Sequence, residues 1–328
     1  MLNLITDIAG ISIGHATDLE LGSGVTAIVF DKPATASGTV LGGAPGGRDT
    51  ALLDPSMMVE QVDAFVLSGG SAFGLDAAGG IQAGLRADGR GFEVGNVRVP
   101  IVPQAILMDL INGGNKDWGL QSPYRDMGYD AYKAAKSGSF DLGTVGAGTG
   151  ATTGTLKGGL GSASARTKSG LTIGAIVAVN ALGSAVVGEG PHFWAAPFER
   201  EGEFGGLGLP SSFSESDVAM RIKGLNLTST TIGLVATNAQ LTKAQTHRLS
   251  IMAHDGLARA ILPAHLPADG DTVFSAATGE KQLTSAGDYF ELCHLATLVM
   301  ARAVARGVHA ATALPQAGTQ PAWCDRFG

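Results

Sequence analysis

The sequence predicts a layered α/β fold. Short runs rich in β-branched residues alternate along the chain with stretches that have helical periodicity. Several of the predicted strands combine glycine with apolar residues, a mixture expected where two sheets pack face to face. Hydrophobic residues make up 45% of the 328 residues and charged residues only 16%. We therefore expect strands that are buried on both sides, with helices outside them.

The predicted elements follow in order along the chain. Strands are expected at 25–30, 64–67, 171–179 and 231–237. Helices are expected at 50–62, 72–86, 241–262 and 285–306. Pro263 ends the third helix, while Ser285 and Gly307 suit the N-cap and C-cap of the last one.

The segment 189–229 differs from its surroundings. It contains three prolines, several glycines and a charged cluster at 199–203, and it ends in a serine-rich stretch. This composition predicts a long loop with a short helix near 217–222. Long loops inside compact domains are often functional, and this one leads directly into the strand that begins at Thr230 and Thr231.

Charge, cysteines and hydropathy exclude several classes of protein. The net charge of −7 and the pI near 5.5 lack the basic footprint of a nucleic-acid binder. Cys293 and Cys324 are too few for a disulfide framework and favour reduced thiols in the cytoplasm. The N-terminal residues do not resemble a signal peptide. Glycine and polar residues interrupt the longest apolar stretch, 171–187, so no membrane span is expected.

Familiar cofactor and metal motifs are weak or absent. The stretch 145–154 fits GxGxxA, but a dinucleotide site would also need an acidic residue about 20 positions later. The sequence has none between Asp141 and Glu189, which favours a glycine-rich loop that packs closely. The seven histidines form neither HExxH nor HxH, and His247 and His254 share a helix face only at a spacing of seven. No GxSxG motif is present. We expect neither a metal nor a cofactor.

Thr230 stands where the polar loop meets an apolar strand. A threonine hydroxyl is a poor nucleophile unless a base takes its proton, and an N-terminal amine can do so. An internal threonine gains that amine only when the preceding peptide bond breaks, here the bond after Ser229. Taken alone, Ser-Thr-Thr before a strand is also ordinary β-propensity. Asp269 and Asp271, separated by Gly270, can point to one place from a turn, or simply belong to a capped surface turn.

Nine stretches in the same order resemble one family, that of L-aminopeptidase/D-esterase, the β-peptidyl aminopeptidases and the nylon-oligomer (6-aminohexanoate-oligomer) endohydrolase. They are 42–49 (GGAPGGRD), 67–76 (LSGGSAFGLD), 146–150 (GAGTG), 157–164 (KGGLGSAS), 177–180 (VAVN), 235–238 (VATN), 241–245 (LTKAQ), 252–260 (MAHDGLARA) and 269–274 (DGDTVF). The resemblance implies an αββα sandwich of the N-terminal-nucleophile (Ntn) hydrolase type. It also implies one domain, 1–328, that cleaves itself into an α chain, 1–229, and a β chain, 230–328.

The resemblance also assigns roles. Thr230 would be the nucleophile, with its new α-amine as base, and the amide of Asn180 would stabilise the oxyanion. Lys157 would hold Asn180 or lower the pKa of the Thr230 amine. Asp269 and Asp271 would orient that amine or receive the ammonium group of a substrate.

The sequence departs from the family at two positions. Ser229 stands where the nylon-hydrolase branch has asparagine, so the rate of self-cleavage is open. Met108 lies near the position of an active-site tyrosine found in some members, and Tyr124 and Tyr129 are the alternatives.

Other interpretations stay open at this point. An acyltransferase of the ornithine-acetyltransferase type also cleaves itself at threonine, but its Ala-Thr-Met-Leu motif is absent. A non-catalytic glycine-rich binding protein would leave Thr230 uncut. The substrate could be a β-aminoacyl peptide, a short L-peptide or a 6-aminohexanoate oligomer. We expect a homo-oligomer, with a tetramer favoured, and no nucleic-acid or membrane partner.

Overall fold

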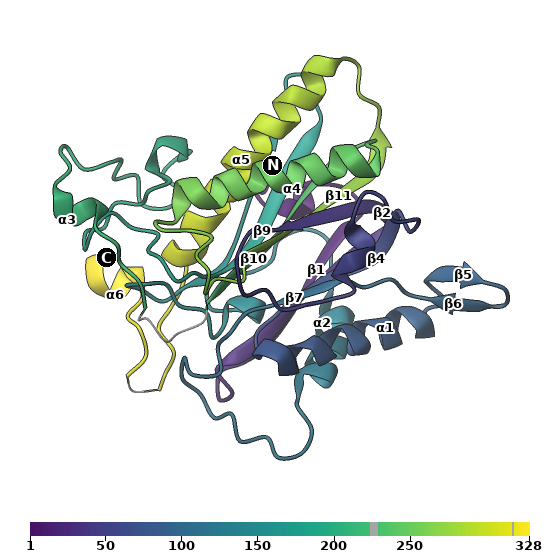
Figure 1. Ribbon diagram of the computed structural model, residues 1–328, viewed down its shortest axis with the longest axis horizontal. Coiled ribbons are helices and arrows are strands. Elements are labelled where there is room, and N and C mark those ends of the chain that lie inside the picture. The colour runs from purple at the N-terminus through teal and green to yellow at the C-terminus, as the bar shows by residue number, and fades with distance from the viewer. Residues whose placement is uncertain (224–228, 317) are drawn as a thin grey trace.

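The computed structural model describes residues 1–223, 229–316 and 318–328, and in these ranges strands and helices form stacked layers (Figure 1). The strands are β1 Ile11–Asp18, β2 Ser23–Val40, β3 Gly47–Arg48, β4 Gln61–Ser68, β5 Phe92–Val94, β6 Val97–Val99, β7 Gln104–Ile106, β8 Gly159–Arg166, β9 Thr172–Asn180, β10 Thr230–Ala239 and β11 Thr272–Lys281. The α-helices are α1 Ala77–Ala87, α2 Tyr124–Ala134, α3 Glu215–Val218, α4 Lys243–Ala260, α5 Ala286–His309 and α6 Trp323–Phe327. Short 3₁₀ turns are η1 Ile5–Asp7, η2 Thr50–Leu53, η3 Ser71–Asp76, η4 Gly146–Gly148 and η5 Ala196–Phe198.

Strand β2 connects two halves of a nine-stranded sheet. The order of the strands is β3-β7-β4-β2-β11-β10-β9-β8, with β1 also on β2. The first half of β2 pairs with β1, and its second half, from Thr35, pairs with β11. Strand β4 pairs with the first half and continues to Ala34 and Thr35. The register shifts between Val29 and Ala34, on either side of Pro33. Because β1 and β11 use different halves of one strand, the sheet divides there into two layers.

The alternation of side chains along the strands confirms the αββα sandwich. In β2, Val25 and Val29 pack against α1 and α2, whereas Ile28 belongs to the core between the two sheets. In β10, Ile232 and Leu234 belong to that inner core, and Val235 packs toward α4 and α5. Phe65 of β4 and Phe274 of β11 stack across the interface, with ring centroids 4.6 Å apart. Figure 1 shows α4 and α5 over one face and α1 and α2 over the other.

The predicted strands at 25–30, 64–67, 171–179 and 231–237 are confirmed, and so are the helices at 241–262 and 285–306. The Ser285 hydroxyl caps α5 by accepting from the Asp288 N–H. Gly307 as the C-cap was wrong, because α5 continues to His309. Gly307 lies against β8, where a Cβ would come within 2.8 Å of the Gly161 nitrogen, so it serves close packing instead.

The predicted helix at 50–62 was wrong. Only the turn η2, Thr50–Leu53, forms there, and β4 begins at Gln61. Pro55 disfavours helical backbone at Asp54, which is extended in ψ. The Lys243 ammonium also takes the carbonyls of Leu52, Met57 and Val59 into hydrogen bonds with α4.

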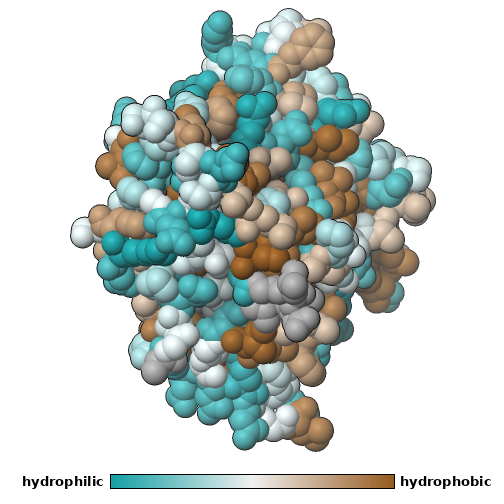
Figure 2. All heavy atoms as spheres, turned by 60° about the vertical axis from the view of Figure 1, so that its left-hand side comes forward, coloured by the Kyte–Doolittle hydropathy of each residue, from teal (hydrophilic) through white to brown (hydrophobic). Residues whose placement is uncertain are grey.

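The loop at 189–229 is described up to residue 223 and again at Ser229, and its short helix is α3, two residues earlier than expected. Figure 2 shows the face that carries this segment and the C-terminus, where hydrophobic side chains gather near the middle of a largely hydrophilic surface. None of the described helices has both the length and the apolarity to cross a membrane.

Candidate active site

Thr230 begins strand β10 at the end of the core between the sheets. Ile232 and Leu234 face the opposite sheet, so the two-residue period of the strand places the Thr230 side chain on that same face. Thr230 Oγ1 donates to the Ser229 carbonyl at 2.6 Å, and the Gly270 N–H donates to the same carbonyl at 2.8 Å. The peptide bond before Thr230 therefore has a hydroxyl beside it and a fixed donor on its oxygen, the kind of donor that acyl transfer requires.

This centre is closed in the uncut chain. Ser229 is 1% exposed and Thr230 4% exposed. Adding a Cβ to Gly270 would bring it within 2.6 Å of both Thr230 Oγ1 and the Ala44 carbonyl. A substrate of several atoms could not reach the hydroxyl without a change at this point.

Asn180 lies directly across the sheet from Thr230, as its partner in the β9–β10 pairing. Its Oδ1 accepts from the Thr152 N–H at 3.0 Å and from the Asn112 amide at 3.2 Å. Its Nδ2 donates to the Met108 carbonyl at 2.9 Å. These partners fix the orientation of the amide. Among the described residues, they use one of the two hydrogens on Nδ2 and leave the other for an incoming acceptor.

Lys223 contacts Asn180 directly, and the sequence analysis missed it. Its ammonium lies 2.8 Å from Asn180 Oδ1 and 3.2 Å from the Asn180 carbonyl. Burial lowers the pKa of Lys223 to about 7. The negative charge of Asp269 acts against this shift, whereas the positive charge of Lys157 adds to it. A cation on Oδ1 polarises the amide and makes its N–H a stronger donor.

Lys157, the lysine implied by the resemblance, is fully buried, and the described acceptors of its ammonium do not include Asn180. It donates to three main-chain carbonyls: those of Gly148 at 3.0 Å, Ala151 at 2.8 Å and Gly158 at 2.9 Å. Burial lowers its pKa to about 7, against the charge of Asp109. Lys157 thus joins the glycine-rich turn η4 to the start of β8, next to the residues that hold Asn180.

Asp269 lies beside the bond before Thr230. It forms a parallel bridge with Ser229, and its carboxylate accepts from the Leu182 N–H at 3.1 Å and the Leu266 N–H at 3.2 Å. Burial, followed by the charge of Asp271, raises the pKa of Asp269 to about 6. A carboxyl group with a pKa in this range can hold or release a proton near neutral pH.

Asp271 faces the start of β10 with one oxygen. Its Oδ1 accepts from the Thr231 N–H at 2.8 Å. Its Oδ2 accepts from His265 twice, from Nδ1 at 2.8 Å and from the main-chain N–H at 3.0 Å. The two aspartates therefore converge on the strand that carries Thr230, as their spacing around Gly270 suggested.

Met108, Tyr124 and Tyr129 were the candidates for the position of the family's active-site tyrosine, and they lie in different places. Met108 reaches Asn180 through its main-chain carbonyl only. Tyr124 is buried elsewhere, with its hydroxyl 2.9 Å from Ser23 Oγ, and Tyr129 is 43% exposed on α2. The described side chains that reach Asn180 are Asn112 and Lys223.

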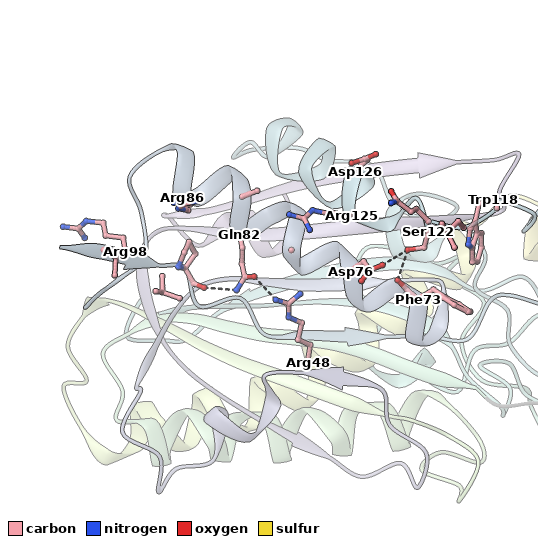
Figure 3. A pocket seen from close by; sticks show the side chains of 18 residues that line it. Arg48, Phe73, Asp76, Gln82, Arg86, Arg98, Trp118, Ser122, Arg125 and Asp126 are labelled. Carbon is pink, nitrogen blue, oxygen red and sulfur yellow. Dashed lines mark hydrogen bonds between the residues drawn. The ribbon is translucent and has the colours of Figure 1, made fainter. Parts of the chain in front are cut away.

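A wide groove lies away from this centre. It has a volume of about 1060 Å³ and runs along α1 and the segment 118–126. Figure 3 shows arginine side chains and Trp118 around it, with Arg48 bonded to Gln82. None of the predicted site residues lines it. Within the described parts of the chain, no three His, Cys, Asp or Glu side chains gather closely enough to hold a metal ion.

Comparison with known proteins assigns the family. The model of peptidase family S58 matches residues 3–320. The chain belongs to peptidase family S58. An uncharacterised aminopeptidase of Mycobacterium tuberculosis is 44% identical over 85% of this chain and 82% of its own length. A 6-aminohexanoate-oligomer endohydrolase of Agromyces sp. is 26% identical over 84% of this chain and 75% of its own. This S58 chain is therefore a hydrolase of the aminopeptidase or amidase type.

Solved structures agree with the fold of the S58 chain. A β-aminopeptidase of Burkholderia sp. superposes with a TM-score of 0.71 at 21% identity, over 99% of this chain and 92% of its own. The L-aminopeptidase D-Ala-esterase/amidase of Ochrobactrum anthropi gives 0.72 at 18% identity over the same shares, and its structure is described as a variant of the Ntn hydrolase fold. The resemblance drawn from the nine sequence stretches is confirmed at the level of family and fold.

Proposed function

We propose that this S58 chain cleaves itself between Ser229 and Thr230 and then hydrolyses short amides with Thr230 as an N-terminal nucleophile. The observation that carries the proposal is the pair of donors on the Ser229 carbonyl: Thr230 Oγ1 at 2.6 Å and the Gly270 N–H at 2.8 Å. The hydroxyl that must attack and the donor that must stabilise the resulting oxyanion both stand at the bond that must break.

The proposed self-cleavage has two steps, an acyl shift and the hydrolysis of an ester. Thr230 Oγ1 attacks the Ser229 carbonyl carbon, the C–N bond breaks, and the hydroxyl proton passes to the leaving nitrogen. This step converts the amide into an ester on the threonine oxygen. Water then hydrolyses the ester, which leaves a carboxylate on Ser229, a free hydroxyl and a free α-amine on Thr230. The products are chains 1–229 and 230–328.

Substrate hydrolysis uses the same oxygen. The α-amine of Thr230 takes the proton from Oγ1, which attacks the substrate carbonyl, and the amine returns the proton to the leaving nitrogen. The second Nδ2–H of Asn180, which has no acceptor among the described residues and is polarised by Lys223, donates to the oxyanion. Water then releases the acyl group and regenerates Thr230.

The proposed substrates are short linear amides with a free amine at one end. Asp269 and Asp271 supply negative charge beside the nucleophile, where a substrate ammonium could bind. The 44% identical relatives bear the name aminopeptidase, whereas the endohydrolases of 6-aminohexanoate oligomers are 26% identical. We therefore place N-terminal aminoacyl and β-aminoacyl amides first, and 6-aminohexanoate amides second.

Mass spectrometry of the purified protein tests the proposal. The wild-type chain should give two fragments that share its 33.2 kDa as roughly 23 and 10 kDa, whereas Thr230→Ala should stay whole. A panel of p-nitroanilides of alanine, β-alanine and 6-aminohexanoic acid then ranks the substrates. An active wild-type enzyme with an intact chain would refute the proposal, and so would a Thr230→Ala variant that cleaves itself as well as wild type.

We also propose that the chain forms a homo-oligomer, with a tetramer favoured. The hairpin of β5 and β6 projects from the body (Figure 1) and exposes apolar side chains: Phe92 48%, Val94 54%, Val97 52% and Val99 46%. An isolated two-stranded hairpin gains stability when another surface covers it. Light scattering on the wild-type protein and on Val94→Asp should give a smaller assembly for the variant, whereas a monomeric wild type would refute the idea.

A further inference from the structure

His265 is a half-buried titratable residue that the proposed reaction does not use, although it touches the site. Its side chain is 19% exposed, between α4 and the turn before β11. Its backbone has a φ of +59°, in the left-handed region that is uncommon for residues other than glycine, although asparagine, aspartate and histidine adopt it more often than the rest. A residue held in this conformation with its ring against a carboxylate at the active centre suggests a function beyond packing.

We propose that His265 is a positioning residue for the threonine nucleophile, because it holds Asp271 Oδ2 and thereby directs Asp271 Oδ1 at the start of β10. This inference rests on the proposed function. Both His265 donors, Nδ1 and the main-chain nitrogen, bind the same oxygen, at 2.8 and 3.0 Å. The other oxygen already accepts from the Thr231 N–H at 2.8 Å, one residue away from the nitrogen that self-cleavage would free.

The charge of His265 matters as much as its geometry. The groups that face it are Asp271 and Asp269 from the turn before β11, and His254 from α4, whose ring centroid lies 4.9 Å away. His254 Nε2 donates to the Thr39 carbonyl of β2, and its Nδ1 has no hydrogen-bond partner among the described residues. Burial alone lowers the pKa of His265, but the hydrogen bond and charge of Asp271 outweigh it, so the pKa lies above its ordinary value.

A protonated His265 would offset the charge of Asp271. A lone carboxylate beside the Thr230 amine would raise the pKa of that amine and keep it protonated, and so unable to act as a base, up to a higher pH. With its charge balanced by His265, Asp271 can orient the amine without holding it in the ammonium form. His265 would therefore set both the geometry of the base and the acid limb of the pH profile.

Three variants separate these roles. His265→Asn keeps a nitrogen donor near the position of Nδ1 and suits a left-handed backbone, but it removes the charge. His265→Ala removes both donor and charge. His247→Ala is the matched control, because His247 is another half-buried histidine whose Nδ1 lies 3.0 Å from a side-chain oxygen, that of Ser37, away from the site.

The readouts are the extent of chain cleavage on a denaturing gel and kcat/KM against pH with the best p-nitroanilide. We expect the acid limb of both His265 variants to move up by about one pH unit. We expect the plateau to stay near wild type in His265→Asn and to fall roughly tenfold in His265→Ala. The control should match wild type in both respects.

Two results would overturn the inference. One is an acid limb that stays in place in both variants; the other is a plateau lost in His265→Ala with no shift of the limb, since packing alone would produce that. If His265→Ala does not fold, the position of the acid limb in the pH profile of His265→Asn decides whether the inference stands. A wild-type chain that is never cut refutes the proposed function and this inference together, whereas a cut wild type with unshifted limbs refutes only this inference.

Discussion

Gly270→Ala is the sharpest test of how the bond before Thr230 is prepared to break. Gly270 carries no side chain, and its N–H donates to the Ser229 carbonyl at 2.8 Å. A Cβ at this position would stand 2.6 Å from Thr230 Oγ1 and 2.6 Å from the Ala44 carbonyl. An ordinary contact begins near 3.4 Å, so the hydroxyl or the turn must move by about 0.8 Å.

The expected effect follows from that displacement. A misplacement of about 1 Å between reacting groups can cost about a hundredfold in rate, which corresponds to roughly 2.7 kcal/mol of activation free energy. We therefore expect Gly270→Ala to cleave itself about a hundredfold more slowly than wild type. The crowding reaches the Ala44 carbonyl and the start of β10, so the folding of the variant must be measured alongside its cleavage.

The assay is a time course of chain cleavage after rapid purification, followed on denaturing gels and by mass spectrometry. Gly79→Ala in α1 is the control, since its added Cβ would meet nothing closer than Arg48 at 3.7 Å. Thermal unfolding of both variants checks that they fold. Cleavage of Gly270→Ala at the wild-type rate in a folded protein would show that the contact between the Thr230 hydroxyl and the Ser229 carbonyl is not the one that reacts.

Three further substitutions separate other parts of the site and the fold. Asn180→Ala should leave chain cleavage intact, because the described donors on the scissile carbonyl do not include Asn180, but should lower kcat/KM for an amide about a hundredfold; a block in cleavage would contradict this. Because the pKa of Lys223 is lowered to about 7, its cation is lost as the pH rises through that value. Wild-type kcat/KM should therefore fall there. Lys223→Met should have the lower rate below that pH, and its rate should approach that of wild type above it. Replacement of the exposed Lys168 by methionine should keep the wild-type profile. Glu203→Gln should destabilise the protein by about 3 kcal/mol in urea unfolding at pH 7, since it leaves the 2% exposed Arg302 without the carboxylate now 2.5 Å away. Burial raises the pKa of Glu203, but Arg302 outweighs that effect and lowers it overall, so this contribution should be present above the ordinary pKa near 4.5 and lost as the pH falls below it; equal stability of variant and wild type would refute the reasoning.

The sequence predicts well those elements whose own residues decide their structure. Strand β10 has a continuous apolar run, and α5 has a capping serine and a helical period that continues for more than twenty residues. Strand β8 was missed, because its sequence, GLGSASAR, lacks large apolar residues and its glycines serve close contacts with α5. The segment 50–62 has a helical pattern, but Pro55 and the tertiary contacts of Lys243 prevent a helix there.

The same distinction between local sequence and tertiary contacts applies to the residues of the candidate site. Thr230, Asn180, Asp269 and Asp271 were predicted from motifs in sequence order, and the fold brings them to one end of neighbouring strands. Lys223 gave no local signal, since its partner Asn180 lies 43 positions earlier and only the fold joins them. Gly270 could have been noticed between the two aspartates, but its N–H gains meaning only when the parallel bridge to Ser229 is known.

Because β10 lies between two other strands, the proposed cleavage at its first residue has a consequence for how a cleaved enzyme would assemble. This strand is hydrogen-bonded to β9 on one side and to β11 on the other. A break at its first residue would create two new chain ends without separating any of these pairs, so both fragments should stay together through dilution and purification. Separately synthesised fragments face the opposite situation: residues 1–229 would present the unpaired edges of β9 and of the second half of β2, and residues 230–328 would lack the strands that flank β10 and β11. We therefore expect the two proposed fragments to assemble correctly only when they are synthesised as a single polypeptide.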